Sequence, residues 1–360
     1  MKIKDINKED LVIQPIENAD TIPASWYTSK EIYDFEISHL INSEWQYVGN
    51  FSQIPSIGDY FLFEISGKPI LVVRSDDKTI KAFYNVCRHR GGPLALENGS
   101  CKLFQCKYHG WTYKLDGSLH KTPQFGPVEN FNKDEFGLVP VNLDIWENLI
   151  FTMINNPSVN IQKIMSGVKD RIQPINLSDK KFYKRVHYSV NCNWKVYVDN
   201  YLEGYHLNFV HPSLSKLLIP SEYKTEVSEF YSLQYSPLKD DANFYGEGNA
   251  YYYFIFPNIM LNILPGRLQV NLVQPISIDK TIVIFDYFYD DIHSTLNVKK
   301  IEEDIKLSDE IQLEDIMICE KVQKGLLSGA YNKGRISPQS ELGVYHFQSH
   351  LKRKFKTHIE

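Results

Sequence analysis

The chain has 360 residues, a net charge of −5 at neutral pH and a sequence pI near 6.1. A net acidic chain lacks the basic surface that binding to nucleic acid requires, so we expect no nucleic-acid partner. No apolar stretch reaches the roughly 20 residues of a membrane-spanning helix. The charged N-terminus also lacks the apolar core of a secretory signal, so we expect a cytoplasmic protein without membrane attachment.

The length predicts about two domains, each with its own hydrophobic core. Residues 1–44 form an N-terminal segment with one expected helix, Ser29–Ile41. Residues 45–156 contain short alternating strands, among them Tyr60–Ile65 and Pro69–Val73, separated by turn residues. This pattern predicts a small all-β domain.

Residues 157–360 combine helical and strand periodicity and are expected to form the second domain. The expected helices are Val159–Ile172, Trp194–Phe209 and Lys300–Leu327, and the expected strands are Phe182–Val190, Ala250–Phe256, Met260–Leu264, Arg267–Pro275 and Thr281–Tyr289. This order favours an antiparallel sheet flanked by helices, and therefore an α+β chain overall. The basic stretch Lys352–Lys356 is interpreted as a solvated tail.

Two short motifs in the β domain each pair a cysteine with a histidine. They are Cys87 with His89 and Cys106 with His109. Two thiolates and two imidazoles suit a tetrahedral zinc ion, or a [2Fe–2S] cluster with cysteine on one iron and histidine on the other. Because each motif supplies one residue of each type, the spacing favours the cluster over zinc, whose fingers usually place both cysteines first.

The sequence around both motifs resembles the cluster-binding loops of Rieske oxygenases. The resemblance extends over Asn85–Leu94 and Cys106–Gly117. It implies that the two cysteines bind one iron and the two histidines the other. Replacing two thiolates by neutral imidazoles raises the reduction potential of such a cluster.

The second domain contains a further pair of histidines, His206 and His211. Five residues correspond to about 140° around a regular helix, so both face one metal ion only if the helix bends or ends between them. Pro212 indicates an end at this point. Two histidines with one carboxylate would form a facial triad, which leaves positions open for O₂ at ferrous iron.

Asn193–Pro212 resembles the mononuclear-iron helix of Rieske oxygenase α subunits, and Glu310–Leu326 resembles the last helix of that family. The resemblance implies a helix-grip-like catalytic domain with Asp315 as the third iron ligand. Glu314 is the alternative. Asp315 lies on the inward-facing stripe of the helix, where a carboxylate without a partner would be costly.

In this family a carboxylate three positions before the first iron histidine connects the two metal centres of neighbouring subunits. The resemblance therefore implies that Glu203 joins His109 of one chain to His206 of the next, in a head-to-tail homotrimer. Asp199 is the alternative. A carboxylate in this place orients the imidazoles and tunes their basicity.

The second half of the chain resembles the quaternary-ammonium oxygenases, which include choline, carnitine and betaine oxygenases. Aromatic faces hold a permanent cation well. The candidate residues for such contacts are Tyr205, Phe209, Tyr251, Tyr253, Phe256 and Tyr287. Since side chains alternate along a strand, Tyr251 and Tyr253 face one side and Tyr252 and Phe254 the other, and only one set can line a pocket.

The resemblance implies a monooxygenase that uses O₂ to oxidise choline or to demethylate a betaine- or carnitine-like compound. An aromatic-ring hydroxylating dioxygenase and an electron-transfer Rieske protein are the alternatives. No nucleotide-binding fingerprint is present in the sequence. Electrons are therefore expected to come from NAD(P)H through a separate reductase, alone or with a ferredoxin.

Overall fold

The computed structural model describes residues 6–239 and 245–359. The chain forms two compact units, one of Ile41–Lys163 and the other of Met1–Leu40 with Ile164–Glu360. The N-terminal segment thus shares a unit with the C-terminal part of the chain. Within the described residues, no helix is both long and apolar enough to cross a membrane.

The unit Ile41–Lys163 is built from β-strands, as the alternating pattern predicted. Its larger sheet has the order β1 (Gln46–Asn50), β10 (Leu149–Met153), β9 (Pro140–Trp146), β4 (Ile80–Tyr84), β3 (Lys68–Arg74), β2 (Asp59–Ile65), β5 (Gly99–Ser100). A smaller sheet contains β6 (Phe104–Gln105), β7 (Thr112–Tyr113) and β8 (Leu119–Lys121). The two predicted strands are β2 and β3, which pair antiparallel. The all-β prediction is confirmed.

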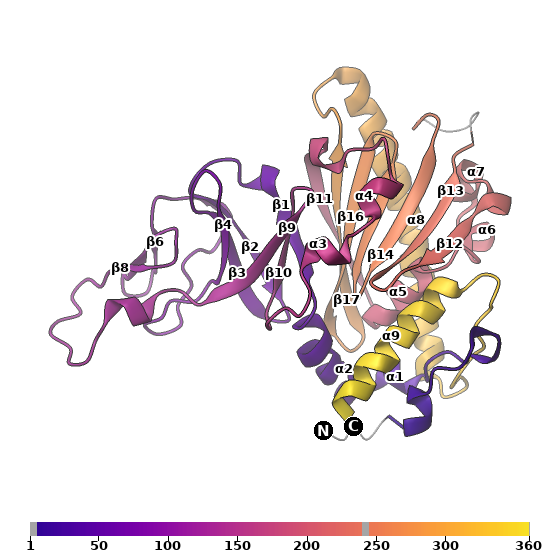
Figure 1. The fold of residues 1–360 in the computed structure, drawn as a ribbon, viewed down its shortest axis with the longest axis horizontal. Helices are drawn as coiled ribbons and strands as arrows, with labels where there is room; N and C mark the ends of the chain where they lie inside the picture. The colour runs from indigo at the N-terminus through magenta and orange to yellow at the C-terminus, as the bar shows by residue number, and fades with distance from the viewer. Residues whose placement is uncertain (1–5, 240–244, 360) are drawn as a thin grey trace. The chain divides into compact units, whose positions relative to one another are not determined.

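The other unit contains a seven-stranded antiparallel sheet (Figure 1). Its order is β11 (Lys181–Val190), β17 (Lys280–Tyr289), β16 (Arg267–Ser277), β15 (Ile259–Leu264), β14 (Asn249–Ile255), β13 (Tyr231–Pro237), β12 (Lys224–Val227). The last two strands were not predicted from the sequence, whereas the other five lie within a few residues of their predicted bounds. The α+β fold class is confirmed.

Helices cover this sheet and its edges. They are α1 (Ser25–Thr28), α2 (Lys30–Glu36), α4 (Val168–Arg171), α5 (Trp194–Tyr201), α6 (Leu207–Val210), α7 (Pro212–Leu217), α8 (Thr295–Leu327) and α9 (Leu342–Ile359), while α3 (Ile161–Ile164) lies at the end of the β unit. Helix α8 runs along the strands on one face of the sheet, behind it in Figure 1. Its Ser308 bonds the Tyr287 hydroxyl of β17 at 2.9 Å.

Two expected helices are shorter than the sequence indicated. The region 159–172 forms only the single turns α3 and α4, with Gly167 at φ +84° between them. The expected helix Trp194–Phe209 ends at Tyr201, and the chain resumes a helix only at Leu207. This second break changes the direction in which the following histidines point.

A buried ion pair ties the N-terminal helices to α5. Lys195 Nζ lies 2.8 Å from Glu36 Oε2, and Trp194 Nε1 donates to the same oxygen at 2.9 Å. Both charged side chains are fully buried. A buried charge is strongly destabilising once its partner is removed, so α2 and α5 are held in one arrangement.

The basic C-terminal stretch is not a solvated tail, and that prediction is wrong. Lys352–Lys356 belongs to α9, which lies beside α1 and α2 in Figure 1. Phe355 is fully buried, with its ring 4.7 Å from those of Trp26 and Phe35. The stretch is part of an amphipathic helix, whose apolar residues recur at helical spacing between the charged ones.

Phe355→Ala should destabilise this unit by about 3–5 kcal/mol, since it leaves a cavity between α9 and the N-terminal helices. Arg353→Ala, an exposed neighbour on the same helix, should change stability by less than about 0.5 kcal/mol. Urea unfolding followed by circular dichroism measures both. Equal midpoints for the two variants would contradict the packing of α9.

Candidate functional site

The two Cys–His motifs form loops with the same backbone geometry. The carbonyl oxygens of Cys87 and Cys106 accept hydrogen bonds from Gly91 and Gly110, each at 3.0 Å, and both glycines have φ +74°. Glycine adopts this conformation without strain. Both cysteine side chains are buried, and the Cys87 sulfur lies 3.2 Å from the Tyr113 hydroxyl.

The histidines of the two loops face each other. The rings of His89 and His109 lie 4.6 Å apart, and His89 stacks on Trp111 at 4.7 Å. Nδ1 of His89 is buried and has no hydrogen-bond partner within the described residues. A side chain at Gly92 would come within 3.1 Å of the Cys106 sulfur. An orphaned imidazole nitrogen and a closely cradled thiol fit a metal cluster between the loops.

His206 and His211 lie outside regular helix, at either end of α6. The chain leaves α5 through Gly204, where a Cβ atom would meet the Tyr223 ring at 2.7 Å. His211 is followed by Pro212, the first residue of α7. The break therefore removes the 140° separation that a continuous helix would impose on the two imidazoles.

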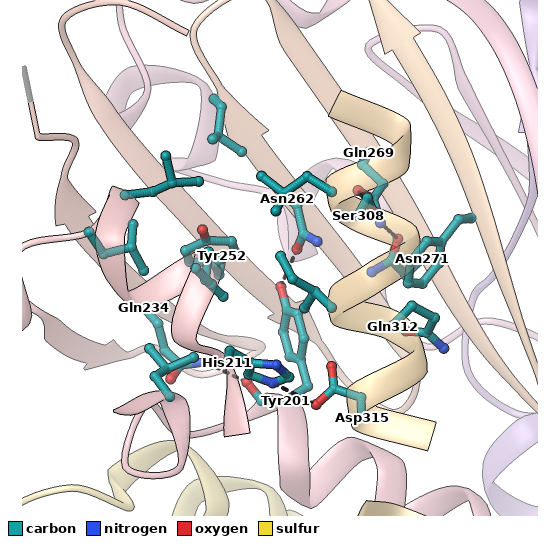
Figure 2. Close-up of a pocket in the computed structure, with 18 of the residues that line it drawn as sticks. Tyr201, His211, Gln234, Tyr252, Asn262, Gln269, Asn271, Ser308, Gln312 and Asp315 are labelled. Atoms are coloured by element: carbon teal, nitrogen blue, oxygen red, sulfur yellow. Dashed lines mark hydrogen bonds and ion pairs between the residues drawn. The ribbon is translucent and has the colours of Figure 1, made fainter. Parts of the chain in front are cut away.

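Both imidazoles point toward Asp315 of α8. His211 Nε2 lies 2.9 Å and His206 Nε2 3.9 Å from Asp315 Oδ1, and the three ligand atoms lie within 4.8 Å of one another. Neighbouring ligand atoms that each lie about 2.1 Å from one metal ion are about 3 Å apart, as His211 Nε2 and Asp315 Oδ1 are. The three side chains therefore fit a mononuclear metal site. Figure 2 shows His211 facing Asp315.

A glutamate holds the other nitrogen of each imidazole. Glu203 Oε1 lies 2.5 Å from His206 Nδ1, and Glu314 Oε2 lies 2.7 Å from His211 Nδ1. A carboxylate at Nδ1 fixes the tautomer that leaves the Nε2 lone pair free for a metal. Glu314, the alternative third ligand, thus contacts the far side of the ring, whereas Asp315 contacts the Nε2 side.

The remaining polar contacts also converge on Asp315. Asn200 Nδ2 donates to Asp315 Oδ1 at 2.6 Å. Burial lowers the pKa of His211, but the carboxylates of Asp315 and Glu314 outweigh it, so the pKa is raised overall. Negative charge in excess of the nearby cations favours a bound metal cation here.

A cavity extends from this cluster between the sheet and α8, and its empty space is about 900 Å³ when the open solvent at its mouth is included. Its floor is a row of paired residues on neighbouring strands, Gln234, Tyr252, Asn262 and Gln269. The strand 267–272 alternates polar and apolar residues although both sets are buried. This alternation in a buried strand was the sequence signal for the cavity wall, and sequence reasoning missed it.

None of the six aromatic residues predicted to contact the substrate lines this cavity. Tyr205 and Phe209 are 60% and 81% exposed. Tyr251 and Tyr253 face the opposite side of the sheet, where Tyr253 packs on Tyr231. The aromatic residues that line the cavity are Tyr197, Tyr201, Tyr223, Tyr245, Tyr252 and Phe285.

The remaining two predicted aromatic residues, Tyr287 and Phe256, also lie outside the cavity lining. Tyr287 lies on the inner face but is fully buried, with its hydroxyl bonded to Ser308. Phe256 follows β14 and packs against Phe347 and His350 of α9. The alternation of side chains was predicted correctly, but only the tertiary structure reveals which face is covered by α8.

Asp199 belongs to an internal network and, among the described residues, forms no hydrogen bond with either iron-site histidine. It accepts hydrogen bonds from Tyr27 at 2.5 Å and from Gln348 at 3.2 Å, and so joins α5 to α1 and α9. Burial raises the pKa of Asp199 to about 7, although both hydrogen bonds and the charge of Lys195 lower it. Its carboxyl group therefore takes up a proton more readily than an exposed aspartate.

Because the pKa of Asp199 is higher in the folded than in the unfolded chain, stability should fall as pH rises from about 4 to about 7. Asp199→Asn mimics the protonated carboxyl and should lack this loss. One pKa unit corresponds to about 1.4 kcal/mol, so the wild type should lose roughly 4 kcal/mol relative to the variant. Parallel pH–stability curves for the two proteins would contradict the assignment.

Comparisons with known proteins match both parts of the chain. The family described as Rieske [2Fe-2S] domain matches residues 44–132, and that described as ring hydroxylating alpha subunit (catalytic domain) matches residues 177–357. The catalytic match excludes the alternative of a Rieske protein that only transfers electrons. The cofactors predicted from the sequence, a [2Fe–2S] cluster and a mononuclear iron, are confirmed for the domains of this chain.

Relatives match nearly the whole chain. Chloroplastic choline monooxygenase of Arabidopsis thaliana is 33% identical, over 95% of this chain and 84% of its own length. The carnitine monooxygenase oxygenase subunit of Escherichia coli K12 is 32% identical, over 94% and 95%. A naphthalene 1,2-dioxygenase from Rhodococcus shares only the fold, at 18% identity and a TM-score of 0.76 over 94% of each chain.

A solved structure of the quaternary ammonium Rieske monooxygenase CntA with L-carnitine has a TM-score of 0.84 and 28% identity, covering 93% of this chain and 96% of its own. The family expected from the two Cys–His motifs is thereby confirmed. With two family matches and relatives above 30% identity over most of their length, this chain belongs to the Rieske non-heme iron oxygenases and is an α subunit.

Proposed function

We propose that this chain is the oxygenase component of a monooxygenase that acts on a small quaternary ammonium compound. The observation that carries the proposal is the convergence of His206, His211 and Asp315 at one end of a cavity large enough for such a compound. Choline and carnitine monooxygenases are among the relatives that match nearly its full length. The proposed reaction is hydroxylation next to the quaternary nitrogen, or demethylation.

We assign Cys87, His89, Cys106 and His109 to the cluster, and His206, His211 and Asp315 to the mononuclear iron. When bound, the cluster supplies single electrons and the ferrous ion supplies open positions for O₂. Other side chains orient the iron ligands through hydrogen bonds to the ligand atoms or to the opposite side of the imidazole rings. Glu203 and Glu314 hold the two imidazoles, and Asn200 holds the carboxylate.

Rieske oxygenases receive electrons from a separate reductase or ferredoxin, and we propose the same for this chain, with NAD(P)H as the source. We further propose a head-to-tail homotrimer in which Glu203 connects His206 to His109 of the neighbouring subunit. The 2.5 Å contact between Glu203 and His206 supports this role. Asp199 is a weaker candidate, because within the described residues it bonds Tyr27 and Gln348 and not His206. Cytoplasmic location stays a prediction, and the plant relatives are chloroplastic.

Substrate recognition is proposed to come from the lining of the cavity. Six aromatic residues line it, five of them tyrosines, so a cation can approach several electron-rich ring faces. Leucines from α6, α7 and the sheet also line the cavity, among them Leu207, Leu214 and Leu264. An apolar wall excludes water from the space next to the metal ligands.

The ligand assignment predicts two graded effects on iron. Asp315→Ala should abolish iron at the mononuclear site, and Glu314→Gln should weaken it by about 10–100-fold through the lost support of His211. Glu303→Gln, an exposed carboxylate on the same helix, is the matched control. Iron per chain is measured together with the visible spectrum of the cluster. Loss of both signals together would indicate misfolding, and full iron in Asp315→Ala would refute the assignment.

The substrate class is tested by single turnovers of reduced, iron-loaded enzyme with O₂. Choline, glycine betaine, carnitine, stachydrine and a neutral arene are offered separately, with mass spectrometry of the products and a formaldehyde assay. Turnover of an ammonium compound is expected, because the lining combines tyrosine faces with excess carboxylate. Formaldehyde would identify a demethylase, and betaine aldehyde a choline oxygenase. Turnover of the arene alone would exclude the proposed substrate class.

A further inference from the structure

The charged groups at the far end of the cavity already neutralise each other. Among the described residues that line the cavity, Arg267 is the only lysine or arginine. Its Nε lies 3.0 Å from Asp304 Oδ2, and both side chains are buried. Asp304 also accepts hydrogen bonds from the hydroxyls of Tyr245 and Tyr289. Arg267 therefore offers little free charge to a ligand, and the cavity must bind a polar group by other means.

The ion pair instead sets the direction of a chain of hydrogen bonds. Arg267 donates to Gln269 Oε1, and a guanidinium cannot accept, so the Gln269 oxygen must face it. Gln269 Nε2 then donates to Asn271 Oδ1 at 2.8 Å, a bond that Figure 2 shows. Because the oxygen of Asn271 is used in this bond, its amide N–H₂ is left as a donor.

Asn271 is only 2% exposed and lines the cavity. Its Nδ2 has no hydrogen-bond partner among the described residues. Asn271 lies diagonally across from Asn262, which faces the same cavity from β15. The Asn271 Nδ2 atom is not among the fully enclosed polar atoms that lack a partner, so it retains some access to the cavity. A donor in this position can bind an acceptor brought by a ligand.

A second buried amide lines the same cavity nearer to the metal ligands. Gln312 is 1% exposed, and its Oε1 accepts from the Tyr197 hydroxyl at 2.6 Å. Its Nε2 is buried without a partner within the described part of the chain. Gln312 precedes Asp315 by one helical turn, about 4.5 Å along α8. Figure 2 shows Gln312 and Asp315 on α8, with Asn271 of β16 labelled beside the same helix.

We propose that the amide N–H groups of Asn271 and Gln312 bind an oxygen atom of the substrate, a hydroxyl or a carboxylate, and so select ammonium compounds that carry one. This inference rests on the proposed function. The oxygen is held by two neutral donors, Gln312 on α8 about one turn before Asp315 and Asn271 on β16, while the ammonium group contacts the tyrosine faces. A compound without such an oxygen leaves both amides unpaired, which is the strongest way a polar site rejects an analogue.

The experiment measures dissociation constants by calorimetry on the iron-loaded, full-length protein, with choline, carnitine and tetramethylammonium, which has no oxygen. Wild type should bind the first two more tightly. Asn271→Leu and Gln312→Met should each weaken carnitine, relative to tetramethylammonium, by about 10–100-fold, and choline by about 2–10-fold, since bonds to a charged oxygen are stronger. Asn332→Asp, on an exposed loop, is the control variant.

Asn271→Asp separates the two oxygen types. Its carboxylate should repel that of carnitine but can accept a hydrogen bond from the hydroxyl group of choline, so carnitine should lose more affinity. Equal changes in the dissociation constants of all three compounds in every variant would overturn the inference. Equal affinity of the wild type for compounds with and without an oxygen would overturn it as well. Turnover is recorded in parallel. Selective binding without turnover would refute the proposed function alone, and turnover with equal changes in binding would refute only the role of the amides.

Discussion

The arrangement of the catalytic unit depends on two hydrogen bonds, in which Nδ1–H of each iron-site histidine donates to a glutamate carboxylate. These bonds turn Nε2 of His206 and His211 toward Asp315. They are possible only because the chain leaves helical geometry after Tyr201, since imidazoles five residues apart on one helix diverge. The break, the packing of Gly204 and the inward face of α8 are thus parts of one requirement, which is to hold three ligands around one point.

Hydrogen bonds also fix the orientation of side chains at the end of the cavity far from the metal ligands. The buried pair of Arg267 and Asp304 fixes the orientation of the Gln269 amide, which in turn fixes that of Asn271. A charge that is neutralised locally thereby determines the polarity of side chains that carry no charge. One metal ligand, Asp315, and one proposed substrate contact, Gln312, lie on α8, so this helix sets the distance between these two side chains.

Much of the fold and of the two metal sites could be predicted from the sequence, because they depend on local patterns of residues. The Cys–His motifs, the pair His206 and His211, and the strands β14–β17 depend on spacing and alternation, which a single chain displays directly. Helix α9 was missed because lysine and arginine obscured its apolar stripe, which is buried only in the presence of the N-terminal helices. The role of Glu314 was also open, since neighbouring carboxylates on a helix differ only in the direction they face.

The sequence by itself determined the family, the two kinds of metal centre and five of the seven strands of the catalytic sheet, because ligand spacing and strand alternation are local properties. Only the tertiary structure decided which face of the sheet α8 covers. It thereby decided that Tyr252 and other residues of the inner face line the cavity, and not the six aromatic residues predicted from the sequence. Strand alternation divides side chains into two sets but cannot tell which set is enclosed, since that depends on helices far away along the chain.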